Sequence, residues 1–343
     1  MTHTDELTVL LDVPARHAGQ NPYISLLADS LRARGARVEF FTWRRALLGR
    51  YSVLHAHWPE YLVWHRRFLV RTAYQIGATA LALRLWLQQR PVVRTVHNRT
   101  PHDALPSRMR TMLRLIESRA RFWIYLTAEG APGTVPSATS SVIPHGHYKD
   151  WPPYRPDATN KAGYVLAFGH LKPYKGYEAL IRAFRATDLP ALKILGRAGD
   201  GSYLSTLRDA AGADPRVEID SRYLPDRELA QAISGAHMVV LPYKDFYNSG
   251  AALLALSLGT PLVVPKNEIT EALRCEVGAD WVMTYEGALT EDVLGKADGW
   301  AAGQEGPPGP RLAGRDWDPI AREHISAYRT ALQSSRGPRK DRR

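Results

Sequence analysis

The sequence predicts an α/β protein made of two doubly wound parallel domains. Short runs of β-forming residues alternate with longer amphipathic stretches along all 343 residues, which is the pattern of parallel strands connected by helices. A Pro-rich stretch at residues 151–156 interrupts this pattern, and a second α/β series starts at Gly163. The length fits about two domains of roughly 100 to 200 residues each. We expect a ligand-binding cleft between the two domains, at the carboxyl ends of their strands.

The first domain is expected to contain six strands, and its first helix has clear end signals. Asn21 is the expected N-cap, Pro22 suits the first helical position, and Gly35 ends the helix. The strands expected in this domain are residues 8–13, 37–41, 52–55, 92–96, 122–126 and 141–143. Those expected in the second domain are residues 163–168, 192–195, 217–219, 237–241 and 261–264.

Basic residues are concentrated in the N-terminal half. The chain has 45 Lys and Arg against 34 Asp and Glu, a formal net charge of +11. Residues 1–150 contain 20 of the basic and 10 of the acidic residues, and residues 336–343 contain five basic residues and one acidic residue. This asymmetry favours an anionic partner surface, either nucleic acid or the inner leaflet of a membrane.

Cysteine content and the N-terminus bear on the cellular compartment. A single cysteine, Cys275, excludes an internal disulfide and a multi-cysteine metal site. The N-terminal residues lack the basic segment and apolar run of a signal peptide. No uncharged apolar stretch reaches the roughly 20 residues that a membrane span requires. We therefore expect a cytoplasmic protein without a membrane span.

Residues 169–176 (GHLKPYKG) form the strongest motif, because they lie between an apolar strand and a helix. Glycines such as Gly169 let the backbone turn, the helix N-terminus offers free N–H groups, and Lys172 and Lys175 supply positive charge. This combination suits an anionic diphosphate. A solvated lysine pair in an ordinary loop is the alternative.

A second helix N-terminus follows at Asn248, Ser249 and Gly250. Asn248 or Ser249 can cap this helix, and Gly250 allows close approach of a ligand. The helix is so apolar that it must be buried, so only its positive N-terminal end would meet a ligand. A capped core helix without a ligand is the alternative. Arg197, after the strand at residues 192–195, is a further candidate phosphate ligand or a solvated side chain.

Taken together, an ordered set of motifs resembles the GT-B glycosyltransferases of the group 4 type, including enzymes of exopolysaccharide assembly. The resemblance covers nearly the whole chain. The matching segments are residues 21–23 (NPY), 55–60 (HAHWPE), 95–98 (TVHN), 101–103 (PHD), 142–146 (VIPHG), 169–176, 248–250 (NSG) and 259–261 (Gly-Thr-Pro). The implied organisation is an acceptor domain at 1–150, a nucleotide-sugar domain at 151–316, a helix at 317–335 that crosses back, and a basic tail at 336–343.

One departure from the family pattern bears on the mechanism. Many relatives carry two glutamates, spaced by seven residues, that bind the donor sugar and ribose, whereas this chain has Phe246 and Leu254 there. The Asn-Ser-Gly version is similar to a branch with xanthan-type β-mannosyltransferases. That similarity favours inversion at the anomeric carbon and leaves retention open.

The resemblance also implies roles for individual residues. Lys172, Lys175, Arg197 and the helix beginning at Ser249 would offset charge on the leaving diphosphate, so we expect no metal and no cofactor. An inverting transfer needs a general base. We favour Asp103 as this base and Glu60 second, with His102 beside them, and we assign His97 and His145 to the donor sugar. Structural roles for these polar residues are the alternative.

Two amphipathic basic helices are expected at residues 66–90 and 107–121. In the first, Arg66, Arg67 and Arg71 flank an apolar row, and in the second, Arg110 and Arg114 lie away from Met109, Leu113 and Ile116. The apolar row of the first helix is Leu69, Ala73, Ile76, Ala80, Leu83 and Leu87. Each helix can lie on an anionic leaflet or pack as a core helix with a solvated basic face.

These observations predict a glycosyltransferase peripheral to the inner face of the cell membrane. The donor is a nucleotide sugar, GDP-mannose favoured over a UDP-sugar, and the acceptor is a lipid-linked saccharide. A sugar-nucleotide epimerase on the same fold is one alternative. Nucleic-acid binding is another, disfavoured because no nucleic-acid module or series of stacking aromatics is recognised.

Overall fold

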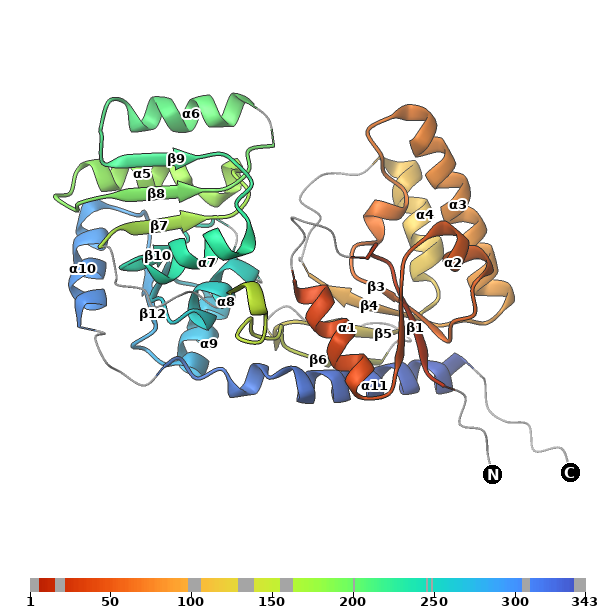
Figure 1. The fold of residues 1–343 in the computed structure, drawn as a ribbon. Helices are drawn as coiled ribbons and strands as arrows, with labels where there is room; N and C mark the ends of the chain where they lie inside the picture. The colour runs from red at the N-terminus through yellow and green to blue at the C-terminus, as the bar shows by residue number, and fades with distance from the viewer. Residues whose placement is uncertain are drawn as a thin grey trace, which may run out of the picture. The chain divides into compact units, whose positions relative to one another are not determined.

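The computed structural model describes residues 6–15, 22–97, 106–128, 139–154, 163–199, 201–244, 246–247, 249–303 and 309–335. The chain forms two compact units (Figure 1). Unit 1 comprises residues 1–17, 23–146 and 317–343, and unit 2 comprises residues 18–22 and 147–316. The boundary at Gly146 precedes the Pro-rich stretch, whose described residues 151–154 belong to unit 2. There the Trp151 indole donates a 3.1 Å hydrogen bond to Asp226.

Unit 1 is built on a six-stranded parallel sheet with the order β2-β1-β3-β4-β5-β6. All six expected strands are present, each within two residues of its expected ends. They are β1 (Thr8–Leu11), β2 (Arg37–Phe40), β3 (Val53–Ala56), β4 (Val92–Val96), β5 (Ala120–Tyr125) and β6 (Thr139–Val142). The strand order reverses between β1 and β3, which creates a topological switch point where such sheets bind ligands.

Two groups of helices pack on this sheet. Helix α11 contacts α1 and strands β3, β4 and β5, whereas α3 contacts both α2 and α4. The helical elements of unit 1 are α1 (Tyr23–Ala33), α2 (Trp43–Leu48), η1 (Pro59–Leu62), α3 (Phe68–Leu87), α4 (Ser107–Glu117) and α11 (Trp317–Ser335). A core of Leu10, Leu54 and other apolar side chains fills the space between the sheet and α2, α3 and α4.

The ends of two helices differ in detail from the expectation. Helix α1 starts at Tyr23, so Pro22 precedes it, and Asn21 lies outside the described residues. Gly35 ends α1 as expected: it has φ +82°, and the hydrogen bonds after the helix form a Schellman motif. The second basic helix is shorter than expected, because Arg121 lies in β5 rather than in α4.

Unit 2 has a second six-stranded parallel sheet, in the order β12-β11-β10-β7-β8-β9. Its strands are β7 (Val165–Phe168), β8 (Leu192–Leu195), β9 (Val217–Asp220), β10 (Met238–Val240), β11 (Leu262–Pro265) and β12 (Val282–Tyr285). Five of the six were expected. The order reverses between β7 and β10, which is the switch point of this sheet.

The helices of unit 2 enclose its sheet. Apolar residues of α5, α6 and α10 share one core with the strands, and α8 and α9 contact β11 and β12. The helical elements are η3 (Pro152–Tyr154), η4 (Pro173–Lys175), α5 (Tyr177–Arg185), α6 (Gly201–Ala211), α7 (Asp226–Ser234), α8 (Gly250–Ser257), α9 (Glu268–Val277), α10 (Glu291–Ala302) and η5 (Ala313–Arg315). The expected α/β class is therefore confirmed for both units.

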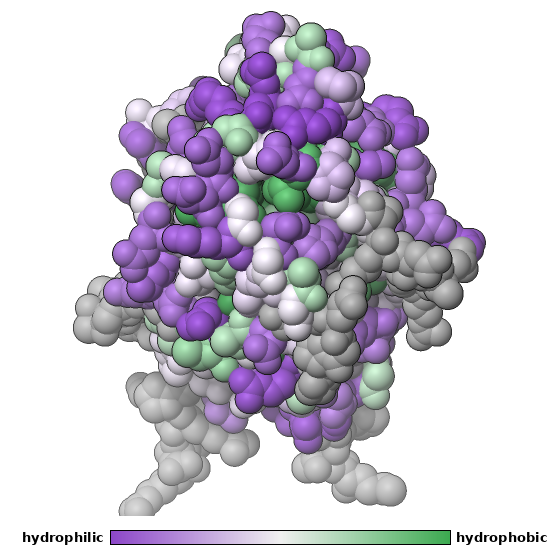
Figure 2. All heavy atoms as spheres, turned by 90° about the vertical axis from the view of Figure 1, so that its left-hand side faces the viewer, coloured by the Kyte–Doolittle hydropathy of each residue, from purple (hydrophilic) through white to green (hydrophobic). Residues whose placement is uncertain are grey.

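The surfaces of the two units differ in apolar exposure. The face of the molecule drawn in Figure 2 is mainly hydrophilic, with hydrophobic colour confined to small areas. Of the twelve large hydrophobic side chains that are exposed among the described residues, eleven belong to unit 1 and only Tyr223 belongs to unit 2. None of the described helices is long and apolar enough to cross a membrane.

Candidate active site

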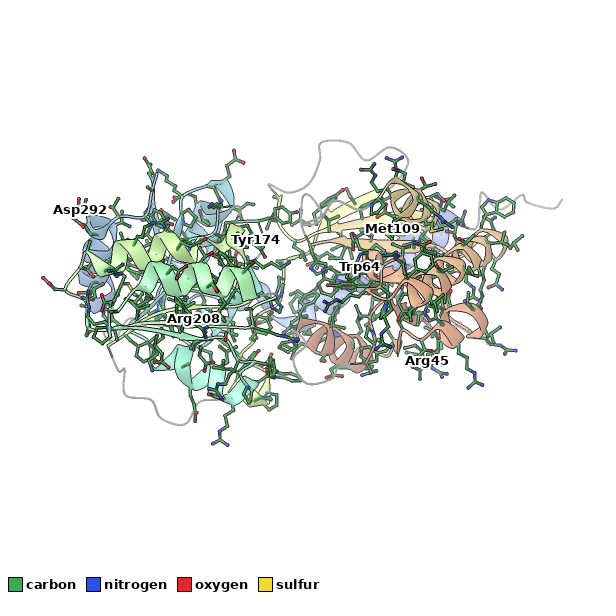
Figure 3. The ribbon with its side chains drawn as sticks, turned by 90° about the horizontal axis from the view of Figure 1, so that it is seen from above. Arg45, Trp64, Met109, Tyr174, Arg208 and Asp292 are labelled. Atoms are coloured by element: carbon green, nitrogen blue, oxygen red, sulfur yellow. The ribbon has the colours of Figure 1, made fainter. Side chains whose placement is uncertain are left out.

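In unit 2, the loop after β7 lies against the loop after β8, backbone to backbone. Gly169 has φ +117°, and a Cβ added to Gly196 would lie 1.9 Å from the Gly169 carbonyl oxygen. The Leu171 amide also donates a 3.0 Å hydrogen bond to the Arg197 carbonyl. Figure 3 shows Tyr174 of the first loop at the N-terminal end of α5. These contacts fix the lysine-bearing loop beside Arg197.

Lys175 is buried in this loop, with 9% of its surface exposed. Its ammonium group donates a 3.0 Å hydrogen bond to the Tyr243 hydroxyl and lies 4.5 Å from the centroid of the Tyr243 ring. Burial lowers the pKa of Lys175 to about 8. No carboxylate of the described residues lies within ion-pair distance of it. A buried ammonium group of this kind is stabilised by an incoming anion.

The three cationic side chains expected to bind the donor lie near one another. Burial lowers the pKa of His170, and the charges of Lys175, Lys172 and Arg197 lower it further. The structure thus brings these three side chains around one histidine in the loop. Their combined field suits a ligand with two or more negative charges.

The N-terminus of α8 is capped as expected. The Ser249 hydroxyl accepts a 3.2 Å hydrogen bond from the Ala252 amide, and α8 begins at Gly250. Most residues of α8 are buried. The amides that lack a partner within the helix are those of its first turn, at this capped end. Asn248 lies outside the described residues.

The sequence analysis missed Tyr243, which connects the two parts of this site. Its hydroxyl meets Lys175 on one side, and it hydrogen-bonds the Ser249 and Tyr177 side chains. Burial raises the pKa of Tyr243, and these two hydrogen bonds oppose the rise. Tyr243 follows β10 and Gly169 follows β7, so the site lies at the switch point of the sheet. Its position just after a buried strand, where such sheets bind ligands, is the sequence feature that could have identified Tyr243 as a site residue.

In unit 1, the switch point between β1 and β3 is occupied by Asp12. This buried carboxylate accepts hydrogen bonds from the His57 amide at 2.8 Å and the Trp58 amide at 3.0 Å. Burial raises the pKa of Asp12 to about 7, while the His57 amide and the charge of Arg94 oppose the rise. Asp12 therefore holds the chain after β3 in place. Sequence analysis did not single it out.

A cluster of histidines surrounds this point. His57 Nδ1 lies 3.0 Å from His97 Nε2, and the His97 ring stacks on Trp58 with centroids 4.3 Å apart. His55 Nδ1 lies 2.7 Å from the Tyr328 hydroxyl, which anchors α11 to β3. Burial lowers the pKa of His55, His57 and His97 well below the ordinary value. These imidazoles are therefore neutral near pH 7, so each can donate one hydrogen bond and accept another.

The structure places His145 in the same cluster as His97. The His145 ring lies 4.3 Å from the Tyr23 ring, which also contacts His97, and its Nδ1 donates a 2.7 Å hydrogen bond to the Gly146 carbonyl. Asp103 and His102 lie outside the described residues.

Glu60, the second candidate base, lies in η1 and is half-buried. Its carboxylate is 3.5 Å from the Arg94 guanidinium, which also pairs with Glu117 at 3.4 Å. The same guanidinium donates a 2.6 Å hydrogen bond to the His57 carbonyl. Glu60 is thereby connected, through Arg94, to the histidine cluster.

The arginines expected to meet a membrane lie on the surface of unit 1. Arg66, Arg67, Arg110 and Arg114 are exposed, and Arg71 is half-buried, with its guanidinium 5.5 Å from the Phe68 ring. In α4 the apolar residues Met109, Leu113 and Ile116 are buried. Helix α4 therefore packs its apolar face in the core of unit 1 and exposes its basic face, where Arg110 and Arg114 are available to an anionic partner.

Comparison with known proteins identifies the family. No protein-family model matches the chain. A GDP-mannose:glycolipid 4-beta-D-mannosyltransferase from Xanthomonas campestris pv. campestris is 38% identical to it over 329 residues, which cover 95% of this chain and 93% of that protein. The chain belongs to the family of this glycosyltransferase. The expected family resemblance is confirmed.

Solved structures show that the glycosyltransferase has the GT-B fold. Sucrose-phosphate synthase from Thermosynechococcus elongatus matches with a TM-score of 0.67 at 17% identity, over 96% of this chain and 100% of that chain. Anabaena HepE in complex with UDP-glucose matches with a TM-score of 0.59 at 15% identity, over 96% and 98%. At these identities the likeness shows the fold alone.

The structure also shows what replaces the two glutamates found in many relatives of this glycosyltransferase. Phe246 is 4% exposed, and its ring centroid is 5.8 Å from that of Tyr243. Leu254 is 5% exposed and lies within α8. Both positions are occupied by buried apolar side chains, so neither can donate or accept a hydrogen bond to a sugar.

Proposed function

We propose that this glycosyltransferase transfers mannose from GDP-mannose to a lipid-linked saccharide. The observation that carries the proposal is the 38% identity, over nearly the full length of both chains, with a protein named GDP-mannose:glycolipid 4-beta-D-mannosyltransferase. The cationic loop of unit 2 supports it, because a nucleoside diphosphate is the leaving group of such a transfer.

Unit 2 binds the donor in this proposal. Lys172, Lys175 and Arg197 contact the diphosphate, together with the first free amides of α8 at Gly250. Ser249 and Tyr243 position the helix and the lysine relative to each other. As the bond between the anomeric carbon and the diphosphate breaks, negative charge grows on the leaving GDP. Preorganised cations stabilise this charge in the transition state.

Unit 1 supplies the general base and contacts to the sugar. An acceptor hydroxyl attacks the anomeric carbon, a carboxylate takes its proton, and GDP leaves from the opposite face, so the configuration inverts. We assign Asp103 as the base, with Glu60 as the second candidate and His102 beside Asp103. The neutral imidazole of His97 and the side chain of His145 hydrogen-bond the donor sugar.

The proposal is tested by incubating the protein with GDP-mannose and a polyprenyl-diphosphate-linked oligosaccharide. We expect a product one mannose longer. The one-bond coupling between its anomeric carbon and proton in NMR spectra should show the β-configuration. UDP-glucose serves as the donor control. An altered nucleotide sugar formed without acceptor would instead identify an epimerase, and an α-linked product would reject inversion.

We expect mannosyl transfer to persist in excess EDTA, because lysine, arginine and helix amides offset the diphosphate charge. The chain carries one Asp-x-Asp sequence, Asp316-Trp317-Asp318, of the type that often binds divalent cations. Both of its carboxylates already have partners in the structure, because Asp316 pairs with His147 at 2.9 Å and Asp318 forms an ion pair with Arg34. Loss of turnover on chelation, restored by Mg²⁺ or Mn²⁺, would contradict metal independence.

The basic surface of unit 1 would hold the enzyme at the inner face of the cell membrane. A cation near an anionic surface contributes about 1 kcal/mol. Arg114→Gln should therefore lower binding to vesicles containing phosphatidylglycerol several-fold, as should Arg110→Gln, since both side chains are exposed. Transfer to a short water-soluble acceptor should not change. Equal loss with both acceptors would place these arginines in the chemistry rather than in docking.

A further inference from the structure

Helix α3 has two apolar faces, and only one of them is buried. The residues that pack into unit 1 are Gln75, Ala78, Leu81, Ala82 and Leu85. The second apolar row consists of Leu69, Ala73, Ile76, Ala80, Leu83 and Leu87, here named the α3 stripe, and all six are exposed. Successive members are four or three residues apart, so they form a single line along the helix. The core-helix alternative therefore does not account for this row.

The α3 stripe is long and strongly exposed. Its ends are 18 residues apart, or about 27 Å at the helical rise of 1.5 Å per residue. The exposed fractions are 80% at Leu69, 67% at Ile76 and 56% at Leu83. Phe68 and Trp86 beside it are 68% and 59% exposed. A continuous apolar surface of this kind marks a contact site rather than ordinary scattered exposure.

The segment that carries the stripe has charges of one sign, and Glu60 just before it pairs with Arg94. Residues 61–90 contain five arginines and no aspartate or glutamate. Arg66 and Arg67 are exposed and form no ion pair with any described residue. Helix α2, which contacts α3, adds the exposed Arg44, whereas its Arg45 pairs with Glu39 at 3.0 Å (Figures 1 and 3). An anionic partner would complement this border.

We propose that the α3 stripe inserts into the outer acyl region of an anionic bilayer leaflet, with the flanking arginines at the level of the lipid headgroups. The charge argues against a second copy of the chain as the occupant. A two-fold contact through the stripe would bring the arginines of both copies together, and residues 61–90 offer no acidic group to pair with them. The inference deepens the proposed function, since it names the surface that brings the enzyme to a lipid-linked acceptor.

Insertion differs from electrostatic docking in its dependence on salt. Apolar burial is unaffected by screening, whereas attraction between exposed charges falls as the Debye length shortens. The double variant Ile76→Gln, Leu83→Gln keeps the net charge and removes apolar surface. We expect it to bind vesicles of phosphatidylglycerol and phosphatidylcholine at least tenfold more weakly in 0.5 M salt. Tyr223→Gln, at the exposed tyrosine of unit 2, is the matched control and should bind like the unaltered protein.

Insertion depth can be measured directly. The only cysteine, Cys275, is exposed in unit 2 and accepts an environment-sensitive fluorophore as a water-facing control. In a Cys275→Ser background, the same fluorophore attached through Leu83→Cys should shift its emission to the blue when vesicles are added. The fluorophore on Cys275 itself should not shift.

Three results would overturn the inference. Vesicle binding that is equal in the double variant and the unaltered protein would exclude insertion. A Leu83→Cys label that stays in water would do the same. A dimer of the unaltered protein, seen by light scattering and abolished by the double variant, would assign the stripe to self-association. Transfer to the soluble acceptor and binding of GDP are measured alongside, so a failure of the proposed function is recognised separately.

Discussion

Replacing Lys175 with methionine should weaken GDP binding roughly 10- to 150-fold and at the same time stabilise the fold. A charge-assisted hydrogen bond to phosphate contributes about 1.5 to 3 kcal/mol, which gives the range in affinity. Stability should rise because the ammonium is buried and its pKa is lowered to about 8. Keeping it charged in the folded state therefore costs up to about 3 kcal/mol at neutral pH. Methionine keeps much of the side-chain volume and removes this cost.

The pH dependence follows from the same pKa. The folded pKa of Lys175 lies below the unfolded value of 10.5, so the unfolded state binds more protons between pH 8 and pH 10.5. Stability of the unaltered protein should rise across this window, and Lys175→Met should remove that component. Affinity for GDP should fall above about pH 8 as the free ammonium loses its proton.

Calorimetric titration with GDP and denaturant unfolding measure the two effects. Lys266→Met is the matched control, because Lys266 is exposed in the same unit and pairs with Glu286 at 2.6 Å. Weaker binding and lower stability together would show that Lys175 is structural. Unchanged affinity would remove it from the donor site.

The strands could be predicted because buried parallel strands appear in the sequence as short continuous apolar runs. β4 and β8 were predicted to the residue. β12 was missed because it lies at the sheet edge and only its first and last residues, Val282 and Tyr285, are buried. Thr284 interrupts the short apolar run that begins at Trp281, so β12 lacks the continuous apolar pattern of the central strands. Helix α3 shows a different limit: its periodicity identifies the helix but does not say which of two apolar rows meets the core.

Some residues of the candidate site could likewise be predicted from the sequence, and others could not. Lys172, Lys175 and Ser249 belong to local patterns of a loop and a helix start, so sequence spacing is enough to find them. Tyr243 is 68 residues away from Lys175, and Asp12 is 45 residues away from His57. Their roles depend on strand order, which brings β7 beside β10 and β1 beside β3. Sequence spacing alone does not contain this order.

Gly196→Ala should lower the free energy of unfolding by about 3 kcal/mol and also weaken GDP binding. The added Cβ would lie 1.9 Å from the Gly169 carbonyl oxygen and 2.7 Å from its carbonyl carbon. Both are backbone atoms of the donor loop, so the clash cannot be relieved by rotating a side chain. Overpacking of this kind costs about 1 to 3 kcal/mol, and the φ of +155° adds strain for a residue with a Cβ.

The loss of binding follows from the direction of the clash. Relief requires the loop after β7 to move away from the loop after β8. That movement separates Lys172 and Lys175 from Arg197, so the three cations no longer act on one diphosphate. Gly199→Ala is the matched control, because it lies three residues further along and a Cβ there meets nothing within 4 Å. Chemical unfolding and GDP titration of both variants measure the effects. Equal stability of the two variants, or full GDP affinity in Gly196→Ala, would show that the close approach of these loops does not hold the donor site together.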